Sequence, residues 1–159
     1  MSSKQYCNKK RLEQGKLDMA SENSIVIKRV FSASAERVFA AWTEVELLKQ
    51  WMGPGKVTVS VAEVDLRVGG AYKLVMNDPE GATHIPSGAY EEIVPNEKLV
   101  FSWSWANSDE VTRVTIELRE LGDNETELTL THVGFAETGV RDHHEEGWNG
   151  CLDKLPAAL

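Results

Sequence analysis

Large apolar residues alternate with smaller or polar residues in six segments along the middle of the chain, and turn-forming residues separate the segments. The clearest alternating sets are Val57, Val59 and Val61; Leu99, Phe101, Trp103 and Trp105; Val114, Ile116 and Leu118; and Leu128, Leu130 and His132. A period of two with one apolar face is typical of an antiparallel sheet that is covered on one side. We therefore predict strands at about 56–65, 70–77, 84–94, 98–105, 111–120 and 125–133.

Helical periodicity is found on both sides of these segments. After a strand-like run at 24–31, Ser34 is a candidate N-cap for a helix over 35–44, and a second short helix over about 45–51 precedes Gly53-Pro54-Gly55, which cannot continue it. Near the end of the chain, over about 137–159, one side of a longer helix carries Val140, His144, Trp148, Cys151 and Leu155. Pro156 predicts that this helix stops or bends near its last turn.

This order of elements predicts an α+β fold: a strand, two short helices, six antiparallel strands and a long C-terminal helix. Helices at both ends of an antiparallel run favour a sheet that curves around the terminal helix. Residues 1–22 show no sustained period and carry few large apolar residues, which predicts a poorly ordered N-terminal extension. We expect residues 23–159 to form a single domain.

Composition and charge narrow the functional classes. The chain has 159 residues, a formal net charge of −8 and a pI near 5.0, and this acidic balance opposes nucleic-acid binding. No apolar run approaches the length of a membrane-spanning helix, so we expect no membrane partner. Cys7 and Cys151 lie far apart and form no metal or redox motif. With no apolar signal segment at the start, a reducing, cytoplasmic location is expected.

The polar residues do not form a recognisable catalytic or metal motif. His143 and His144 are adjacent on a predicted helix, so their side chains diverge by about 100° and do not readily share one ion. Neither glycine cluster has the spacing of a phosphate-binding loop, and there is no nucleophile elbow. Glu63, Asp65 and Arg67 are expected to form a structural ion pair or a hydrogen-bonded turn near the sheet edge. We expect no metal, no cofactor and no catalytic nucleophile.

A series of short motifs follows in order between about residues 24 and 155. They are Arg29-Val30-Phe31, Ala35-Glu36-Arg37-Val38-Phe39, Ala41-Trp42-Thr43-Glu44, Trp51-Met52-Gly53-Pro54, Asp65-Leu66-Arg67-Val68-Gly69-Gly70, Gly88-Ala89-Tyr90-Glu91-Glu92-Ile93-Val94-Pro95, Glu97-Lys98-Leu99-Val100-Phe101, Thr129-Leu130-Thr131-His132 and Gly147-Trp148. The series resembles the START-like (SRPBCC, helix-grip) superfamily and, within it, the family of homologues of the activator of the 90-kDa heat-shock-protein ATPase. This resemblance implies a sheet of six or seven antiparallel strands that grips the C-terminal helix and leaves an apolar cavity between them. It implies no fixed catalytic set.

The predicted apolar faces supply the residues that would line such a cavity. The candidates are Phe101, Trp103, Trp105, Leu130 and His132 from the strands and His144, Trp148 and Cys151 from the terminal helix. Plain core packing is the simpler interpretation of the tryptophans. For His132 and His144 the simpler interpretation is a buried imidazole whose hydrogen bonds are satisfied within the protein. The sharper hypothesis is that His132 and His144 are the few polar groups that orient a ligand in an otherwise apolar pocket.

Three functions remain open at this point. The first is a small binding module that holds a hydrophobic small molecule in the helix-grip cavity. The second is a partner-binding, co-chaperone-like protein, although the eukaryotic co-chaperone that names the family contacts its chaperone through an additional N-terminal domain that residues 1–22 do not resemble. The third is a cyclase- or hydrolase-type enzyme that uses His132 or His144 as general acid–base. The first is favoured, and an enzyme is less favoured than a binding protein.

Overall fold

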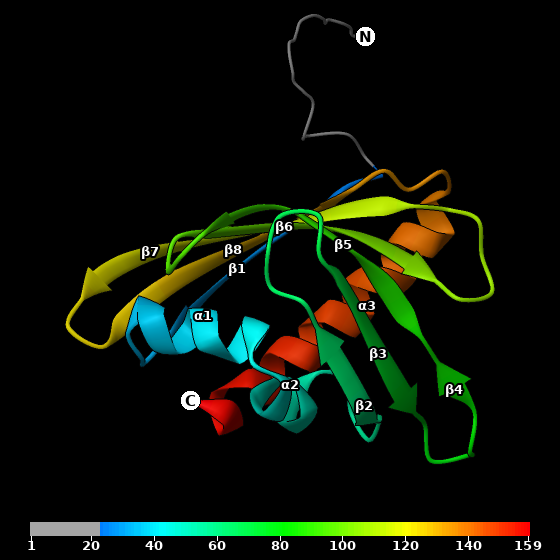
Figure 1. Cartoon of the computed structure of the whole chain (residues 1–159), viewed down its shortest axis with the longest axis horizontal. Helices are drawn as coiled ribbons and strands as arrows, with labels where there is room; N and C mark the ends of the chain where they lie inside the picture. Colours follow the sequence, from blue (N-terminus) through cyan, green and yellow to red (C-terminus); the bar gives the residue numbers. More distant parts are fainter. Residues whose placement is uncertain (1–22) are drawn as a thin grey trace, which may run out of the picture.

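One antiparallel sheet of eight strands curves around the C-terminal helix (Figure 1). The computed structural model describes residues 23–159, so the predicted extension over 1–22, including Cys7, lies outside the described residues. The elements are β1 (Ile25–Phe31), α1 (Ala35–Thr43), α2 (Val45–Trp51), β2 (Thr58–Val64), β3 (Ala71–Asn77), β4 (Thr83–His84), β5 (Pro86–Val94), β6 (Lys98–Trp105), β7 (Thr112–Gly122), β8 (Glu125–Val133), α3 (Thr138–Lys154) and the short 3-10 helix η3 (Leu155–Ala158). The predicted α+β fold is confirmed.

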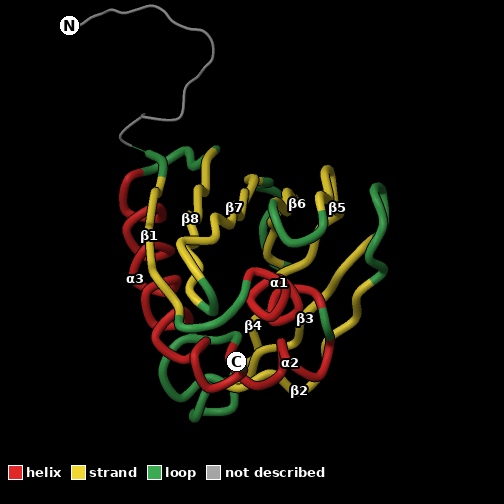
Figure 2. Tube along the Cα trace, turned by 90° about the vertical axis from the view of Figure 1, so that its left-hand side faces the viewer, coloured by secondary structure: helices red, strands yellow, loops and turns green. Residues whose placement is uncertain are grey.

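The strands follow the order β1-β8-β7-β6-β5-β3-β2, and β4 pairs with β3 beside this path. All pairs are antiparallel. The two short helices lie inside the curve of the sheet, next to the C-terminal end of the chain (Figure 2). The core therefore fills the space between the concave face of the sheet, the helix pair α1–α2 and one side of α3.

The helix ends are where the sequence places them. The Ser34 hydroxyl accepts a hydrogen bond from the backbone N–H of Arg37 at 3.3 Å and caps α1. Gly53 follows α2 with a φ of +105°, a conformation that glycine adopts without strain. α3 gives way to η3 at Leu155, because Pro156 has no N–H to continue the α-helical ladder. Among the described residues no helix is both long and apolar enough to cross a membrane.

The strand predicted over 84–94 is interrupted. It forms two strands, β4 and β5, which keep the same register against β3 because His84 pairs with Met76 and Ser87 pairs with Lys73. The break falls at Ile85, directly before Pro86, which begins β5 and has no N–H to give to a neighbouring strand. The interruption leaves a short separate strand beside the cavity described below.

The alternation predicted for β2 is wrong beyond its first half. Val59 is in the core as expected, but Val61 is 41% exposed, and Ala62 and Val64 pack against the core instead. The register between β2 and β3 shifts between Val59 and Val61. Such a bulge adds one residue to a strand, and a shift of one residue exchanges the two faces.

Candidate functional site

A cavity of about 630 Å³ opens between α3 and the sheet. This volume lies within the usual range for small-molecule sites. The lining comes from five segments of the chain: Met52, Pro54 and Val57; Met76 and Asp78; Thr83, His84 and Ile85; Trp103, Trp105, Ala106 and Asn107; and His143, His144, Gly147, Trp148 and Cys151. Its buried lining residues are apolar or sulfur-containing, whereas most of the polar ones are exposed. The cavity therefore has an apolar interior and a polar mouth.

Five of the eight predicted lining residues are brought together at this cavity, namely Trp103, Trp105, His144, Trp148 and Cys151. Phe101 is two residues before Trp103 on β6 and instead borders a separate space of about 20 Å³ with Tyr72 and Tyr90. Leu130 and His132 are fully buried and do not line the large cavity. Phe101 and Leu130 are therefore core residues beyond the end of the cavity.

His132 is in the middle of a series of hydrogen bonds that uses both of its ring nitrogens. The indole N–H of Trp148 donates to Nδ1 at 2.9 Å, and Nε2 lies 2.6 Å from the hydroxyl of Thr112. Because the indole only donates, Nδ1 carries the lone pair and Nε2–H donates to Thr112, which in turn donates to the carbonyl of Trp103 at 3.2 Å. Burial, with a smaller contribution from His144, lowers the pKa of His132 from 6.5 to about 3.

His144 is fixed in a similar way at the cavity wall. Its Nδ1 lies 2.8 Å from the carbonyl of Val140, and its Nε2 accepts the indole N–H of Trp105 at 2.8 Å. A carbonyl only accepts, so the proton is on Nδ1 and the ring is neutral. Burial is the main reason that the pKa of His144 is lowered. Both nitrogens of both predicted histidines are thus engaged with protein groups, which favours the structural interpretation of these residues over the hypothesis that they orient a ligand.

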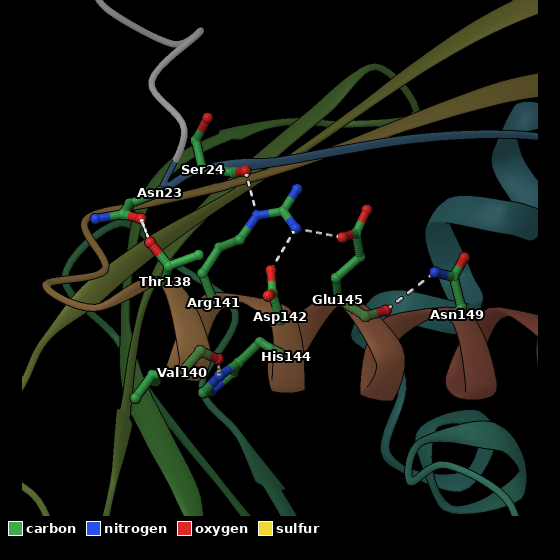
Figure 3. Close-up of polar contacts among 9 residues, drawn as sticks. All are labelled: Asn23, Ser24, Thr138, Val140, Arg141, Asp142, His144, Glu145 and Asn149. Carbon is green, nitrogen blue, oxygen red and sulfur yellow. Dashed lines mark hydrogen bonds and ion pairs between the residues drawn. The ribbon is translucent and has the colours of Figure 1, made fainter.

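Polar contacts at the start of α3 fix the helix that carries His144. Arg141 donates through Nε to the carbonyl of Ser24 at 2.8 Å and pairs with Asp142 at 2.9 Å and with Glu145 (Figure 3). In the same view the His144 ring lies on the other side of α3 from this cluster. The cluster holds the helix to the beginning of β1 and leaves the opposite side of α3 to form the cavity wall.

The loop over 53–57 closes another part of the wall and is tied to α3. The Lys154 ammonium group donates to the carbonyls of Gly53, Gly55 and Val57 at 2.7, 3.1 and 3.0 Å. The backbone N–H of Gly53 donates to the Cys151 sulfur at 3.3 Å. Burial raises the pKa of the Cys151 thiol to about 11, so this cysteine is a neutral packing residue and not a nucleophile.

The structure adds a polar pair that the sequence analysis did not select. Nε2 of His84 lies 3.0 Å from a carboxylate oxygen of Asp78, and both residues line the cavity. The other carboxylate oxygen accepts the backbone N–H groups of Glu80 and Ala82, at 3.0 Å each. The hydrogen bond from His84 is the largest cause that lowers the pKa of Asp78. The sequence Asp78-Pro79-Glu80-Gly81 is a turn signal that could have indicated this pairing.

Other predicted features behave as structural elements. Arg67 Nε lies 2.9 Å from an Asp65 oxygen, which confirms the ion pair in the β2–β3 connection. Within residues 23–159 no group of three histidine, cysteine, aspartate or glutamate side chains could hold a metal ion. Two buried indole N–H groups, those of Trp42 and Trp103, have no hydrogen-bond acceptor in the same part of the chain.

Comparisons with known proteins agree with this fold. Residues 32–159 match the family described as "Activator of Hsp90 ATPase homolog 1-like protein". The structure of a protein from Chromobacterium violaceum is 30% identical in sequence and has a TM-score of 0.79; the match covers 86% of this chain and 96% of that protein. The structure of a protein from Nitrosomonas europaea is also 30% identical and has a TM-score of 0.76; the match covers 87% of this chain and 95% of that protein. An Hsp90 activator from Plasmodium falciparum is 28% identical with a TM-score of 0.67, covering 84% and 94%. No curated protein matches the chain significantly.

Proposed function

The chain belongs to the family of activator-of-Hsp90-ATPase homologues, and we propose that it is a binding protein that holds an apolar small molecule in the cavity beside α3. The single observation that supports this function is the cavity itself, about 630 Å³ with Trp103, Trp105 and Trp148 in its wall. A wall of this kind matches small-molecule sites, which are concave and mostly lined by apolar and aromatic side chains.

Gly147 offers a direct test because it lines the cavity and a Cβ added there would meet no atom within 4 Å. The side chain added in Gly147→Leu therefore begins in open space and is expected to fill part of the cavity. Leucine also favours the helix over glycine, so the variant is expected to fold. Gly139→Leu is the matched control, since Gly139 is also on α3 with open space around its Cβ, but does not line the cavity.

The measurement is the rise in emission of the uncharged probe N-phenyl-1-naphthylamine during titration of each protein. We expect saturable binding to the wild type and to Gly139→Leu, and at least about tenfold weaker binding to Gly147→Leu, because the added side chain occupies the space of the probe. A probe that fails to bind the wild type, or that binds Gly147→Leu equally well, would contradict the proposal.

Contact with a 90-kDa chaperone is a second candidate function, favoured by the likeness to the Plasmodium falciparum Hsp90 activator. Protein interfaces commonly need a continuous apolar patch. Among residues 23–159 the exposed large apolar residues form only two local pairs, Val26 and Val30 on β1 and Leu66 and Val68 in the β2–β3 connection. The others, Val61, Val111 and Leu121, lie on separate segments. We expect no stimulation of a purified chaperone ATPase at an equimolar ratio, and clear stimulation would favour this second function.

The acid–base alternative has less support. A general acid or base needs a ring nitrogen within hydrogen-bond reach of the substrate. His132 is fully buried, and at His144 a substrate would have to displace either Trp105 or Val140 from the ring. The binding function requires neither displacement.

A further inference from the structure

The mouth of the cavity differs in chemistry from its interior. Met52, Met76, Trp103, Trp148 and Cys151 are buried lining residues. Thr83, His84, Asn107 and His143 also line the cavity and are exposed. A bound molecule would therefore have an apolar body in contact with the interior and any polar group at the mouth.

The lining offers a ligand no charged side chain that is free of other partners. No lysine or arginine of residues 23–159 is among the lining side chains. The one carboxylate, that of Asp78, already accepts hydrogen bonds from His84, Glu80 and Ala82. An ionised group that leaves water needs a partner to offset the loss of hydration, and here it would find none that is free.

Of the three lining histidines, His84 is the one that a protein group holds through one ring nitrogen while the other nitrogen is left over. His144 is held through both nitrogens, and His143 has no hydrogen-bond partner within residues 23–159 to fix its ring. Asp78 accepts from Nε2, so in the neutral ring the proton is on Nε2 and Nδ1 carries a lone pair. Within the described part of the chain Nδ1 has no hydrogen-bond partner, in contrast to both nitrogens of His132 and His144. A nitrogen in this state accepts a hydrogen bond, and a hydroxyl group is the simplest uncharged donor.

We infer that the cavity selects an uncharged ligand that carries a hydroxyl group, and that this hydroxyl donates a hydrogen bond to Nδ1 of His84. This inference rests on the proposed binding function and adds the chemical class of the ligand. The Asp78–His84 pair fixes the acceptor, the exposed polar residues surround it, and the tryptophan-lined interior takes the rest of the molecule.

The first experiment tests the exclusion of charge with matched probes at about pH 8, where histidine side chains are ordinarily neutral. N-phenyl-1-naphthylamine is compared with 8-anilinonaphthalene-1-sulfonate, which has the same rings and a sulfonate. The cationic 2-naphthyltrimethylammonium ion is compared with its uncharged isostere 2-tert-butylnaphthalene by displacement of the first probe. We expect each charged member to bind at least about tenfold more weakly than its uncharged partner.

The second experiment tests the hydroxyl contact by a double comparison. The affinities of 2-naphthol and 2-methylnaphthalene are measured in the wild type, in His84→Phe and in the control His143→Phe. We expect the ratio of the two affinities to fall by about threefold to tenfold in His84→Phe, the size of one neutral hydrogen bond, and to stay unchanged in His143→Phe. Because both side chains are exposed, both variants should fold, and their melting temperatures check this.

The outcomes separate the two proposals. If no uncharged probe binds the wild type, the binding function itself fails. If uncharged probes bind and Gly147→Leu weakens them, the function stands. In that case equal binding of a charged probe in the same site, or an affinity ratio that His84→Phe leaves unchanged, overturns the inference about the ligand.

Discussion

Trp148 and Trp105 each donate an indole N–H to a histidine at nearly the same distance, 2.9 and 2.8 Å, yet the two pairs stand in different surroundings. His132, the partner of Trp148, is fully buried and passes the interaction on to Thr112. His144, the partner of Trp105, is half-buried, and both members of that pair line the cavity. The same indole-to-imidazole hydrogen bond is thus present in both pairs. The burial of each pair and its further hydrogen-bond partners decide how much the loss of that bond should destabilise the protein.

Removal of the two indoles should give the largest difference. Trp148 is 3% exposed and packs against the rings of Trp42, Trp103 and His132. Trp148→Ala should therefore lower the free energy of unfolding by about 3–5 kcal/mol, as for other large-to-small core changes. Trp105→Ala should cost about half of that or less, because this side chain lines the cavity and is only partly buried. Chemical denaturation of both variants measures the difference.

Both tryptophans line the cavity, so equal losses in the two alanine variants would show that the partly exposed wall at Trp105 is as closely packed as the buried wall at Trp148. Trp51→Ala is a positive control, since this tryptophan is fully buried, donates to the carbonyl of Ala41 at 2.8 Å and lies outside the cavity lining. Its loss should be at least as large as that of Trp148→Ala.

Replacement of the histidines should repeat the contrast at a smaller scale. His132→Leu removes the acceptor of a buried indole N–H, and an unsatisfied buried donor costs about 1–3 kcal/mol. His144→Leu should cost less than about 1 kcal/mol, because the partly buried Trp105 can turn to water at the cavity. Unfolding curves of both variants give the two values, and a larger loss for His144→Leu would contradict the comparison.

Acid should destabilise the protein mainly through His132, the buried partner of Trp148. The unfolded chain protonates His132 near pH 6.5, but the folded protein does so only near pH 3, because burial lowers the pKa. The free energy of unfolding therefore falls as the pH falls below about 6.5, by about 2 kcal/mol between pH 8 and pH 5. Burial also lowers the pKa of His144, which adds a loss of the same sign.

The control for this pH dependence is His132→Gln, which keeps a polar side chain and removes the titrating group. Its free energy of unfolding should change less between pH 8 and pH 5 than that of the wild type. His144→Gln should reduce the pH dependence by a smaller amount. An unchanged pH dependence in His132→Gln would show that other groups cause the loss.

Most of the fold could be predicted from the sequence because its signals are local. The period of two identified the inward faces of β6, β7 and β8, and the helical period identified the inward side of α3. The two errors have equally local causes. Pro86 interrupts the hydrogen-bond ladder with β3, and a bulge near Ser60 exchanges the faces of β2. Neither change alters the apolar pattern on which the prediction depended.

The candidate site was harder to predict because it depends on where elements separate. Periodicity placed Phe101 and Trp103 on one face of β6, but it cannot tell how far along the strand α3 stays in contact, and only Trp103 reaches the large cavity. Likewise it cannot show that His132 is sealed by partners from other elements. The Asp78–His84 contact forms across a turn and a two-residue strand, where no period exists.

The smallest expected effect comes from removal of the indole N–H groups alone. Trp148→Phe keeps most of the ring but leaves Nδ1 of the buried His132 without a donor, which should cost about 1 kcal/mol. Trp105→Phe should stay within about 0.5 kcal/mol of the wild type, because water at the cavity can donate to Nε2 of the half-buried His144. Denaturation curves give both values, and N-phenyl-1-naphthylamine titrations of Trp105→Phe should show an affinity within about twofold of the wild type, since an aromatic wall remains. If Trp105→Phe destabilised the protein as much as Trp148→Phe, both hydrogen bonds would be equally inaccessible to water. His144 would then be a core residue and not part of the wall of a binding site.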